Sequence, residues 1–510
     1  PAPGPAPAGP PDRPRAPRPL PRGVSDVRAV DDDVTGAVRR TLTVLLAERE
    51  AAARAVDPLF AGDLAARVSR FTVSGGKFGR SRLLWWAGRA CGAPGAGAPP
   101  GVDSVLRVAA ALELIQTCAL VHDDVMDAAP VRRGRPALHA DVSAQYTESA
   151  PGPRGARLGE ASAILAGDLA LAWADDVVAE TDLPPGTARR VRELWRAMRT
   201  EMIAGQYLDV HGEATAGRSV DRALRAACLK SARYSVEHPL ALGAALAGAD
   251  RSTTAALRTA GRCVGLAFQL RDDLLDAFGD PRVTGKPTGD DIRAGKPTYL
   301  AALAHTRASA ASDASSVAVL DATLGRLDAS DAEVERVRRV FVSTGARDAV
   351  EAAIHRLTAR GLRHLDTAGL RPGGRERLAA LLRAVASAPR APDTATPAGP
   401  PPAVATGTPT PGAAPEAGTA APSRTAPGSA SGPPAPGTPP RVAEAGRDPR
   451  PGQPAARLRA APHSTAAPGE HPPPPGSPSA GPEADSGPPG TGGPPPRAPR
   501  FDVSGGEACP

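Results

Sequence analysis

Residues 102–127 read VDSVLRVAAALELIQTCALVHDDVMD, an apolar stretch that ends in a group of carboxylates. Hydrophobic residues recur along it at the three- and four-residue spacing of a helix. Positions i and i+4 share one helix face, so Asp123 and Asp127 project together. A single DDxxD pattern also fits an exposed acidic helix end, and its meaning depends on the rest of the chain.

A second carboxylate group ends another apolar stretch, FQLRDDLLD at residues 268–276. Its polar residues fall at i, i+3, i+4 and i+7 on one helix face: Gln269, Asp272, Asp273 and Asp276. Like charges on one face repel each other, and buried charges are costly without partners, so cations between them are indicated. Magnesium commonly bridges one or two carboxylates to substrate phosphates. The two groups together predict a site for several magnesium ions and a diphosphate.

Helical periodicity also dominates the chain between its two ends. Strand-like alternation is almost absent, so we predict an all-α helical bundle. Long helices are predicted at Val34–Val56, Val102–Met126, Ala161–Val178, Ala188–Val210, Val220–Leu246 and Ala255–Phe278. Shorter ones are predicted at Thr298–Leu303, Ala332–Phe341, Ala346–Leu365 and Glu376–Val385. Glycine and proline mark loops at Ala93–Gly101, Ser149–Gly155 and Gly279–Pro297.

The two ends of the 510-residue chain have a different composition. Residues 1–24 are rich in proline, and residues 389–510 consist mostly of Pro, Ala, Gly, Ser and Thr. Such segments bury too little apolar surface to offset the entropy lost on ordering. We therefore expect a disordered arm at 1–24, one helical domain at 25–388 and a disordered tail at 389–510.

Composition excludes several other classes. The formal charge of +7 is modest, and arginines do not alternate with aromatics along one stripe, so no nucleic-acid partner is expected. The sequence has no uninterrupted apolar run long enough to cross a membrane, so no membrane span is expected. The five cysteines show no CxxC spacing, and their odd number argues against a disulfide framework. A reducing, cytoplasmic location is expected.

Basic residues recur next to the carboxylate groups. GGKFGR at residues 75–80 is a glycine-rich turn that offers backbone N–H groups and two cations to an anion. Two further arginines follow the first DDxxD pattern, where bidentate phosphate contacts are natural. Each of these features alone also fits an ordinary surface. Their combination predicts binding of a polyanionic small molecule by Lys77, Arg80, Arg132, Arg133, Lys230, Lys286 and Lys296.

In this combination the chain resembles the trans-isoprenyl diphosphate synthases, the polyprenyl synthetase family that includes farnesyl and geranylgeranyl diphosphate synthases. The resemblance runs from about Val34 to Val385. It is carried, in the family's order, by GGKFGR (75–80), LVHDDVMDAAPVRRGRPALH (120–139), GQYLDV (205–210), KSARY (230–234), FQLRDDLLD (268–276) and GKPTGDDIRAGKPT (285–298).

The resemblance implies an isoprenoid synthase-type bundle around a deep central cavity, usually a homodimer. It implies condensation of isopentenyl diphosphate with an allylic prenyl diphosphate, with about three magnesium ions per active site. The principal magnesium ligands would be Asp123, Asp127 and Asp272, supported by Asp124, Asp273 and Asp276. Contacts to the allylic diphosphate would come from Arg132, Lys230, Gln269, Lys286 and Lys296, with Lys230 counted among the catalytic groups. Contacts to isopentenyl diphosphate would come from Lys77, Arg80 and Arg133.

Three positions depart from the family pattern. Gln116 stands where many members have a histidine that contacts isopentenyl diphosphate, and it can donate a hydrogen bond but carries no charge. Ser81 replaces a proline, and Ser231 replaces a threonine while keeping the hydroxyl. Gln116 and Ser231 remain candidates for substrate binding, and none of the three is a predicted metal ligand.

Product length in this family depends on what blocks the growing chain beneath the first DDxxD pattern. The residues one turn back on that helix are Cys118 and Ala119, and both are small. Farnesyl synthases tend to carry an aromatic residue there, or two extra residues in the motif. The sequence therefore favours geranylgeranyl diphosphate. A farnesyl product stays open, and so does a longer one, because Ile115 and Ala111, further along the same face, are also compatible with longer chains.

Two other functions fit parts of the pattern. A class I terpene cyclase shares the fold and the first DDxxD pattern, but its second metal motif usually mixes Asn, Ser or Thr, and Glu. A non-catalytic subunit that regulates another synthase typically loses metal-binding aspartates, whereas all six are present here. Incorporation of labelled isopentenyl diphosphate distinguishes both from a synthase.

Overall fold

The structure, a computed structural model, describes residues 26–93, 100–280 and 288–387. These residues fall within one compact unit. The predicted arm at 1–24, the predicted tail at 389–510 and the candidate Lys286 lie outside the described residues.

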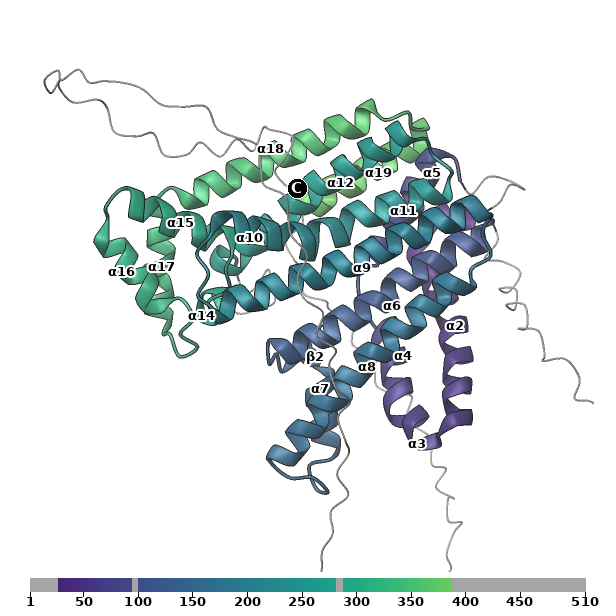
Figure 1. The fold of residues 1–510 in the computed structure, drawn as a ribbon, viewed down its shortest axis with the longest axis horizontal. Coiled ribbons are helices and arrows are strands. Elements are labelled where there is room, and N and C mark those ends of the chain that lie inside the picture. The colour runs from purple at the N-terminus through teal and green to yellow at the C-terminus, as the bar shows by residue number, and fades with distance from the viewer. Residues whose placement is uncertain (1–25, 94–99, 281–287, 388–510) are drawn as a thin grey trace, which may run out of the picture. The chain divides into compact units, whose positions relative to one another are not determined.

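The described chain is almost entirely helical, which confirms the predicted all-α fold (Figure 1). Its only strands form a short hairpin, in which Val131 pairs with Pro136 and Arg132 with Arg135. The elements run in the order α1 (Val27–Asp32), α2 (Val34–Val56), α3 (Pro58–Phe60), the π-helix η1 (Ala61–Ala65), α4 (Ala66–Val73), α5 (Gly79–Cys91), α6 (Val102–Met126), β1 (Val131–Arg132), β2 (Arg135–Pro136), α7 (Leu138–Gln145), α8 (Pro153–Glu180), α9 (Pro185–Ala214), α10 (Val220–Ala227), the π-helix η2 (Cys228–Glu237), α11 (His238–Leu246), α12 (Arg251–Phe278), α14 (Asp290–Ala294), α15 (Tyr299–Ala310), α16 (Ala314–Thr323), α17 (Asp331–Ser343), α18 (Ala346–Thr367) and α19 (Pro372–Ser387).

Several boundaries differ from the sequence prediction. Helix α8 begins at Pro153, inside a predicted loop, because proline is well tolerated in the first turn of a helix. The predicted loop Gly279–Pro297 contains the short helix α14. The predicted helix Val220–Leu246 is continuous, but its middle part is the π-helix η2. Helices α1, α3, α4, α7 and α16 and the π-helix η1 are not among the predicted helices.

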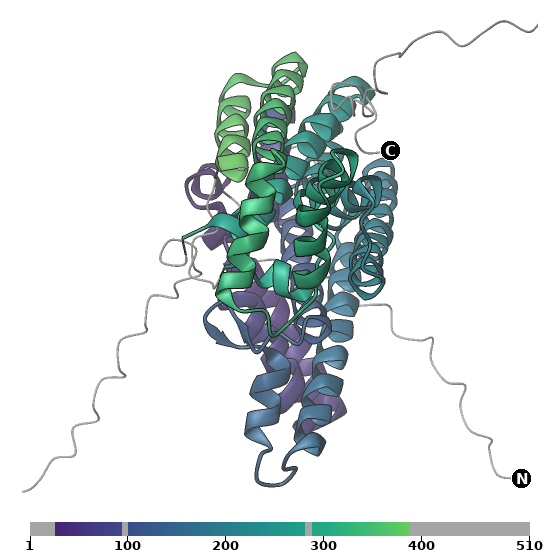
Figure 2. The ribbon, with the colours of Figure 1, turned by 90° about the vertical axis from the view of Figure 1, so that its left-hand side faces the viewer.

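Helix α6 lies at the centre of the bundle. Its side chains are buried along most of its length, and it packs against α2, α5 and α8. Figure 1 shows α8 running beside α6, and Figure 2 shows α7 against the start of α8 at one end of the bundle. This packing carries the DDxxD end of α6 to a position enclosed by other helices.

Helix α6 also bears on the expectation of no membrane span. Among the described helices, it alone is long and apolar enough to cross a membrane by length and composition. However, 78% of its apolar stretch is buried inside the bundle. Its hydrophobicity is therefore explained by its central place in the core.

Candidate active site

Asp123 lies near the C-terminal end of α6, where three other elements meet. Its Oδ1 accepts hydrogen bonds from Gln206 at 3.1 Å and from Lys230 at 3.3 Å, and its Oδ2 accepts one from Arg132 at 3.4 Å. Burial alone would raise the pKa of Asp123, but the charges of Lys230, Lys296 and Arg132 offset it and the pKa is lowered. Asp123 therefore stays ionised, and the basic side chains of Lys230, Lys296 and Arg132 stabilise its charge.

Asp124, the next residue, points into the protein and is 1% exposed. Arg132 donates to its Oδ1 through Nε at 2.6 Å, while its Oδ2 has no hydrogen-bond partner among the described residues. Burial raises the pKa of Asp124 in spite of this arginine. The hairpin turn at Arg133 and Gly134, both with positive φ, brings Arg132 back onto the end of α6.

Lys296 links the first carboxylate group to Asp291 on helix α14. Its Nζ donates to Asp127 Oδ2 at 2.8 Å and lies 3.9 Å from Asp291 Oδ1. Burial would lower the pKa of Lys296, but Asp291 and Asp127 raise it. This lysine therefore stays charged between the C-terminus of α6 and helix α14.

Lys230 reaches the same region from η2. Its Nζ donates to Asp209 at 2.6 Å as well as to Asp123. Burial opposes its charge, but Asp209 and Asp123 raise its pKa. Helix α9 can approach η2 this closely because Gly205 has no side chain: a Cβ there would lie 2.2 Å from the Lys230 backbone nitrogen.

The second carboxylate group, on α12, is buried at Asp273 and half-buried at Asp272 and Asp276, and it is crowded with like charges. Asp273 accepts a hydrogen bond from Gln269 at 2.8 Å, yet burial, with help from Asp272 and Asp209, raises its pKa to about 7. Burial likewise raises the pKa of Asp276 to about 6, although the Asp291 N–H donates to it at 3.0 Å. These carboxylates lack sufficient positive charge from the described protein residues.

This donor set fits magnesium. Among the described residues, no group of three or more His, Cys, Asp or Glu side chains is arranged to hold a metal ion by itself. Magnesium needs no such cage, because one or two carboxylates and substrate phosphates suffice. The crowded carboxylates of α12 and the unpaired Oδ2 of Asp124 are oxygen donors of the kind that hard cations prefer.

A different set of side chains surrounds Arg80 on α5. Its guanidinium lies 4.4 Å from the centroid of the Tyr234 ring, and its Nη2 donates to Ser235 at 2.7 Å. The Tyr234 hydroxyl in turn donates to Gln116 Oε1 at 2.9 Å. The structure thus brings two predicted residues, Arg80 and Gln116, together through one tyrosine. Lys77, in the loop before α5, is exposed.

Arg133 turns away from its neighbour Arg132 and faces the glycine-rich loop. Its guanidinium lies 5.2 Å from the Phe71 ring, and a Cβ on Gly75 or Gly76 would come within 3.0–3.2 Å of it. The glycines of this loop therefore make room for the arginine. The two consecutive arginines serve separate regions: one faces the carboxylates, and the other faces the loop that carries Lys77.

Comparison with known proteins shows similarity to one family over most of the folded region. Residues 63–340 match the family model described as polyprenyl synthetase. The chain is 34% identical over 287 residues to a (2E,6E)-farnesyl diphosphate synthase of Mycobacterium tuberculosis, covering 56% of this chain and 72% of the relative. It is also 34% identical over 287 residues to a geranylgeranyl diphosphate synthase of the same species, covering 56% and 74%.

The chain belongs to the polyprenyl synthetase family. It is thus a prenyltransferase of the trans-prenyl diphosphate synthase type. A solved geranylgeranyl pyrophosphate synthase from Corynebacterium glutamicum, complexed with isoprenyl diphosphate and magnesium, superposes with a TM-score of 0.64 at 38% identity, covering 69% of this chain and 98% of that one. The resemblance inferred from the motifs is confirmed, while relatives with two different products leave the product length open.

The two predicted chain-length positions lie one helical turn before the DDxxD pattern on α6. Cys118 is 4% exposed, and burial raises the pKa of its thiol to about 12. Its Sγ lies 3.8 Å from His122 Nδ1, and His122 Nε2 lies 3.0 Å from the Ile164 carbonyl oxygen of α8. Ala119 is half-buried. No large side chain occupies either predicted position.

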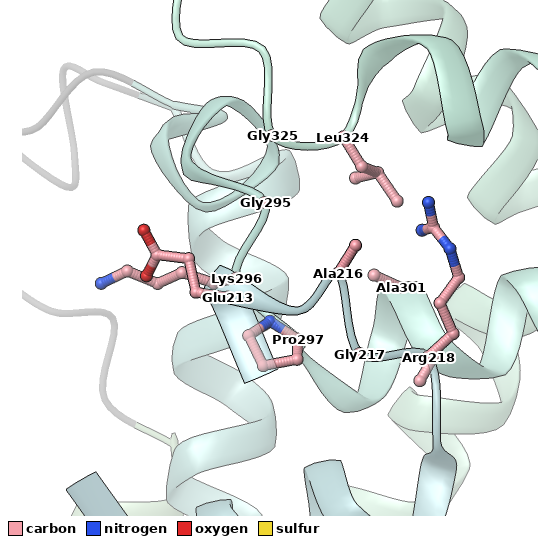
Figure 3. Close-up of a pocket in the computed structure, with 11 residues that line it drawn as sticks. Glu213, Ala216, Gly217, Arg218, Gly295, Lys296, Pro297, Ala301, Leu324 and Gly325 are labelled. Carbon is pink, nitrogen blue, oxygen red and sulfur yellow. The ribbon is translucent and has the colours of Figure 1, made fainter. Parts of the chain in front are cut away.

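A pocket opens beside the Lys296 loop (Figure 3). Its wall combines the end of α9 and the turn after it with the Gly295–Pro297 turn and Leu324–Gly325. These segments touch through glycines: a Cβ on Gly212 would lie 2.7 Å from Pro297, and one on Gly295 would lie 2.7 Å from Gly325. Close backbone packing therefore fixes the turn that carries Lys296 to this synthase's carboxylates.

The structure adds residues that sequence reasoning did not single out. Asp209 and Gln206 lie in the quoted motif GQYLDV, and Asp291 lies between the two lysines of the loop motif. Tyr234 and Ser235 contact Arg80. The acidic residues could have been found as charges inside recognised motifs.

Two further predicted site residues lie on the same elements. Ser231 is half-buried on η2, and Asp272 is half-buried on α12.

Proposed function

We propose that this prenyltransferase condenses isopentenyl diphosphate with an allylic diphosphate, head to tail and trans, and that geranylgeranyl diphosphate is its main product. The observation that supports this most is the division of the site into two basic regions. The carboxylate region holds Lys230, Lys296 and Arg132, and the isopentenyl region holds Arg80 and Arg133. A condensation of two diphosphates requires two such regions.

The carboxylate region would bind the allylic diphosphate. Its magnesium ligands would be Asp123, Asp127 and Asp272, supported by Asp124, Asp273 and Asp276, and about three ions would be held together with the substrate. When bound, magnesium supplies positive charge that neutralises the departing diphosphate. The protein contacts to that diphosphate would come from Arg132, Lys230, Ser231, Gln269, Lys286 and Lys296.

The isopentenyl region would bind the second diphosphate through Lys77, Arg80 and Arg133. Arginine guanidinium groups suit bidentate phosphate contacts, and Arg80 is already oriented by the Tyr234 ring and the Ser235 hydroxyl. Gln116 can offer its amide N–H groups, because its Oε1 accepts from Tyr234.

The reaction follows from these positions. The allylic carbon–oxygen bond breaks, and its electron pair leaves with the diphosphate, which Lys230, Lys296 and Arg132 stabilise electrostatically. The double bond of isopentenyl diphosphate attacks the allylic cation and forms the new carbon–carbon bond. The released diphosphate then takes the proton whose loss regenerates a double bond, so no side-chain base is required.

The product length would be set at Cys118 and Ala119, both of which have small side chains. A larger residue at the half-buried Ala119 should block chain growth. Replacing Ala119 with Phe should therefore shift the product towards farnesyl diphosphate, measured by chain-length analysis of the prenyl diphosphates. An unchanged product spectrum would show that this position is not the floor of the cavity.

We further propose that residues 25–388 form one catalytic domain that acts as a homodimer in the cytoplasm. Helices α8 and α9 expose large apolar side chains, Leu158, Ile164 and Leu165 on one and Ile203 and Tyr207 on the other. Exposed apolar patches of this kind mark protein interfaces. Light scattering of the purified protein should give the mass of a dimer; a monomeric mass would overturn this part.

The function itself is tested with purified protein, magnesium, an allylic diphosphate and labelled isopentenyl diphosphate. Formation of longer prenyl diphosphates supports the synthase. Release of a hydrocarbon from the allylic substrate alone would indicate a terpene cyclase. No incorporation with any allylic primer would indicate a non-catalytic subunit.

A further inference from the structure

The π-helix η2 lies between α9 and α12, and three glycines allow the contact. A Cβ on Gly205 would lie 2.2 Å from the Lys230 nitrogen, one on Gly265 would lie 2.6 Å from the Ala232 carbonyl oxygen, and one on Gly261 would lie 2.7 Å from the Glu237 Cα. A π-helical turn is wider than an α-helical one and is rare over ten residues. Such segments persist only where their surroundings hold them, and they are frequent at functional sites.

The side chains of η2 reach both regions of the site. Near its start, Lys230 contacts Asp123 and Asp209 in the carboxylate region. One turn further along, the Tyr234 ring and the Ser235 hydroxyl hold Arg80 in the isopentenyl region. A single helical segment therefore determines how the two diphosphate regions are placed relative to each other.

The C-terminal end of η2 is fixed by a buried carboxylate, Glu237, which is 0% exposed. Its oxygens accept from Arg258 Nε at 2.8 Å and from Arg262 Nε at 2.9 Å, and Arg233 Nε lies 3.7 Å away. Arg233 is itself held by Glu201 at 3.0 Å. A carboxylate buried to this degree persists only because it is paired, and here its pairs join η2 to α12.

We propose that Glu237 is a positioning residue that holds η2 in the register aligning the two diphosphate regions; this rests on the function proposed above. Without its negative charge, three arginines would lack their common partner and would repel one another. Relaxation of the π-helical turn towards an α-helical one shifts the register by one residue, a rotation of about 100°. Lys230 and the Tyr234–Ser235 pair could then no longer face their partners together.

The test is Glu237→Gln, which preserves the shape of the side chain and removes its charge. We expect the KM for both substrates to rise together and kcat/KM to fall by up to about 100-fold, because a displacement near 1 Å has consequences of that size. Tyr234→Phe is the comparison, since it removes only the bond to Gln116 and should raise the KM for isopentenyl diphosphate alone.

The matched control is Asp31→Asn. Asp31 accepts hydrogen bonds from Trp85 and Arg89 at 2.9 Å, and neither partner is a residue of either region of the site. Both variants lose a carboxylate paired with arginine, so both should lower Tm. Kinetics are measured well below the Tm of each, where Asp31→Asn should keep both KM values and Glu237→Gln should not.

A second variant keeps the test decisive if Glu237→Gln does not fold. Gly261→Ala would push against the Glu237 Cα and should raise both KM values together, while Gly186→Ala on α9, where a Cβ meets nothing within 4 Å, should not. Wild-type KM values for either substrate in folded Glu237→Gln and Gly261→Ala would overturn the proposal. A rise in the KM for one substrate alone would overturn it too. Failure of the wild-type protein to condense the substrates would instead overturn the proposed function.

Discussion

The two regions of the site bind negative charge by different means. In the carboxylate region, Asp123 and Asp127 pair with Lys230 and Lys296, while buried carboxylates on α12 crowd one another. In the isopentenyl region, Arg80 and Arg133 lie against aromatic rings, without such crowding. The first region therefore sets lysines against carboxylates, whereas the second holds its arginines against aromatic rings.

The largest expected effect comes from removing a charge at the centre of the carboxylate region. Asp123→Asn should lower kcat by roughly 1000-fold, the scale of losing one charged group that stabilises a transition state. The KM for isopentenyl diphosphate should change little, because Asp123 contacts no residue of the isopentenyl region. Steady-state kinetics with each substrate varied in turn would measure this. A large rise in that KM would contradict the division into two regions.

The next effect concerns the isopentenyl region. Arg80→Gln should raise the KM for isopentenyl diphosphate by about 10- to 100-fold, since charge-assisted contacts are lost. The KM for the allylic substrate should stay the same. Arg82→Gln, on the same helix but outside the described contacts of the site, serves as the control. Equal rises in both KM values for Arg80→Gln would show that the regions are not separate.

The crowded carboxylates predict how the metal-free protein responds to pH. The folded-state pKa values of Asp273 and Asp276, about 7 and about 6, lie above the ordinary value of 3.8. The folded protein therefore binds more protons than the unfolded chain between about pH 4 and pH 7, and its stability falls as pH rises through that window. The loss of unfolding free energy across this window should be of the order of a few kcal/mol.

Thermal unfolding at pH 5 and pH 8 with a chelator measures this loss. Magnesium with inorganic diphosphate should reduce the pH dependence of the thermal stability. In the metal-free protein, Asp273→Asn should weaken the same pH dependence. A metal-free protein that is more stable at pH 8 than at pH 5 would contradict the crowding described for α12.

The smallest effect tests the packing that positions Lys296. Gly212→Ala should press on Pro297 and raise the KM for the allylic substrate a few-fold, of the order of 1 kcal/mol or less. The KM for isopentenyl diphosphate should not change. Gly186→Ala on the same helix is the control. No change in either KM would show that the Lys296 turn tolerates movement of Pro297.

Much of this organisation could be predicted from the sequence. Apolar periodicity located α6 and α12, and the DDxxD spacing placed the carboxylates on their ends. The motif order identified the family. The consecutive pair Arg132 and Arg133 was assigned to two substrates, and the structure directs the two side chains to different regions.

The remaining features depend on contacts between distant segments. Asp209 becomes a partner of Lys230 only because Gly205 lets α9 approach η2 closely. The period of 3.6 residues predicted one helix across Val220–Leu246, and it cannot reveal a π-helical segment that surrounding helices impose. The full burial of Glu237, at the end of this segment, likewise depends on the helices packed around it.

The central claim is that two separate diphosphate regions serve one condensation. The most direct measurement incubates the purified protein with magnesium, farnesyl diphosphate and labelled isopentenyl diphosphate, and determines the chain length of the labelled product. Our account predicts labelled geranylgeranyl diphosphate, and no labelled product when magnesium is chelated. Absence of labelled prenyl diphosphate with every allylic primer, in the presence of magnesium, would contradict it.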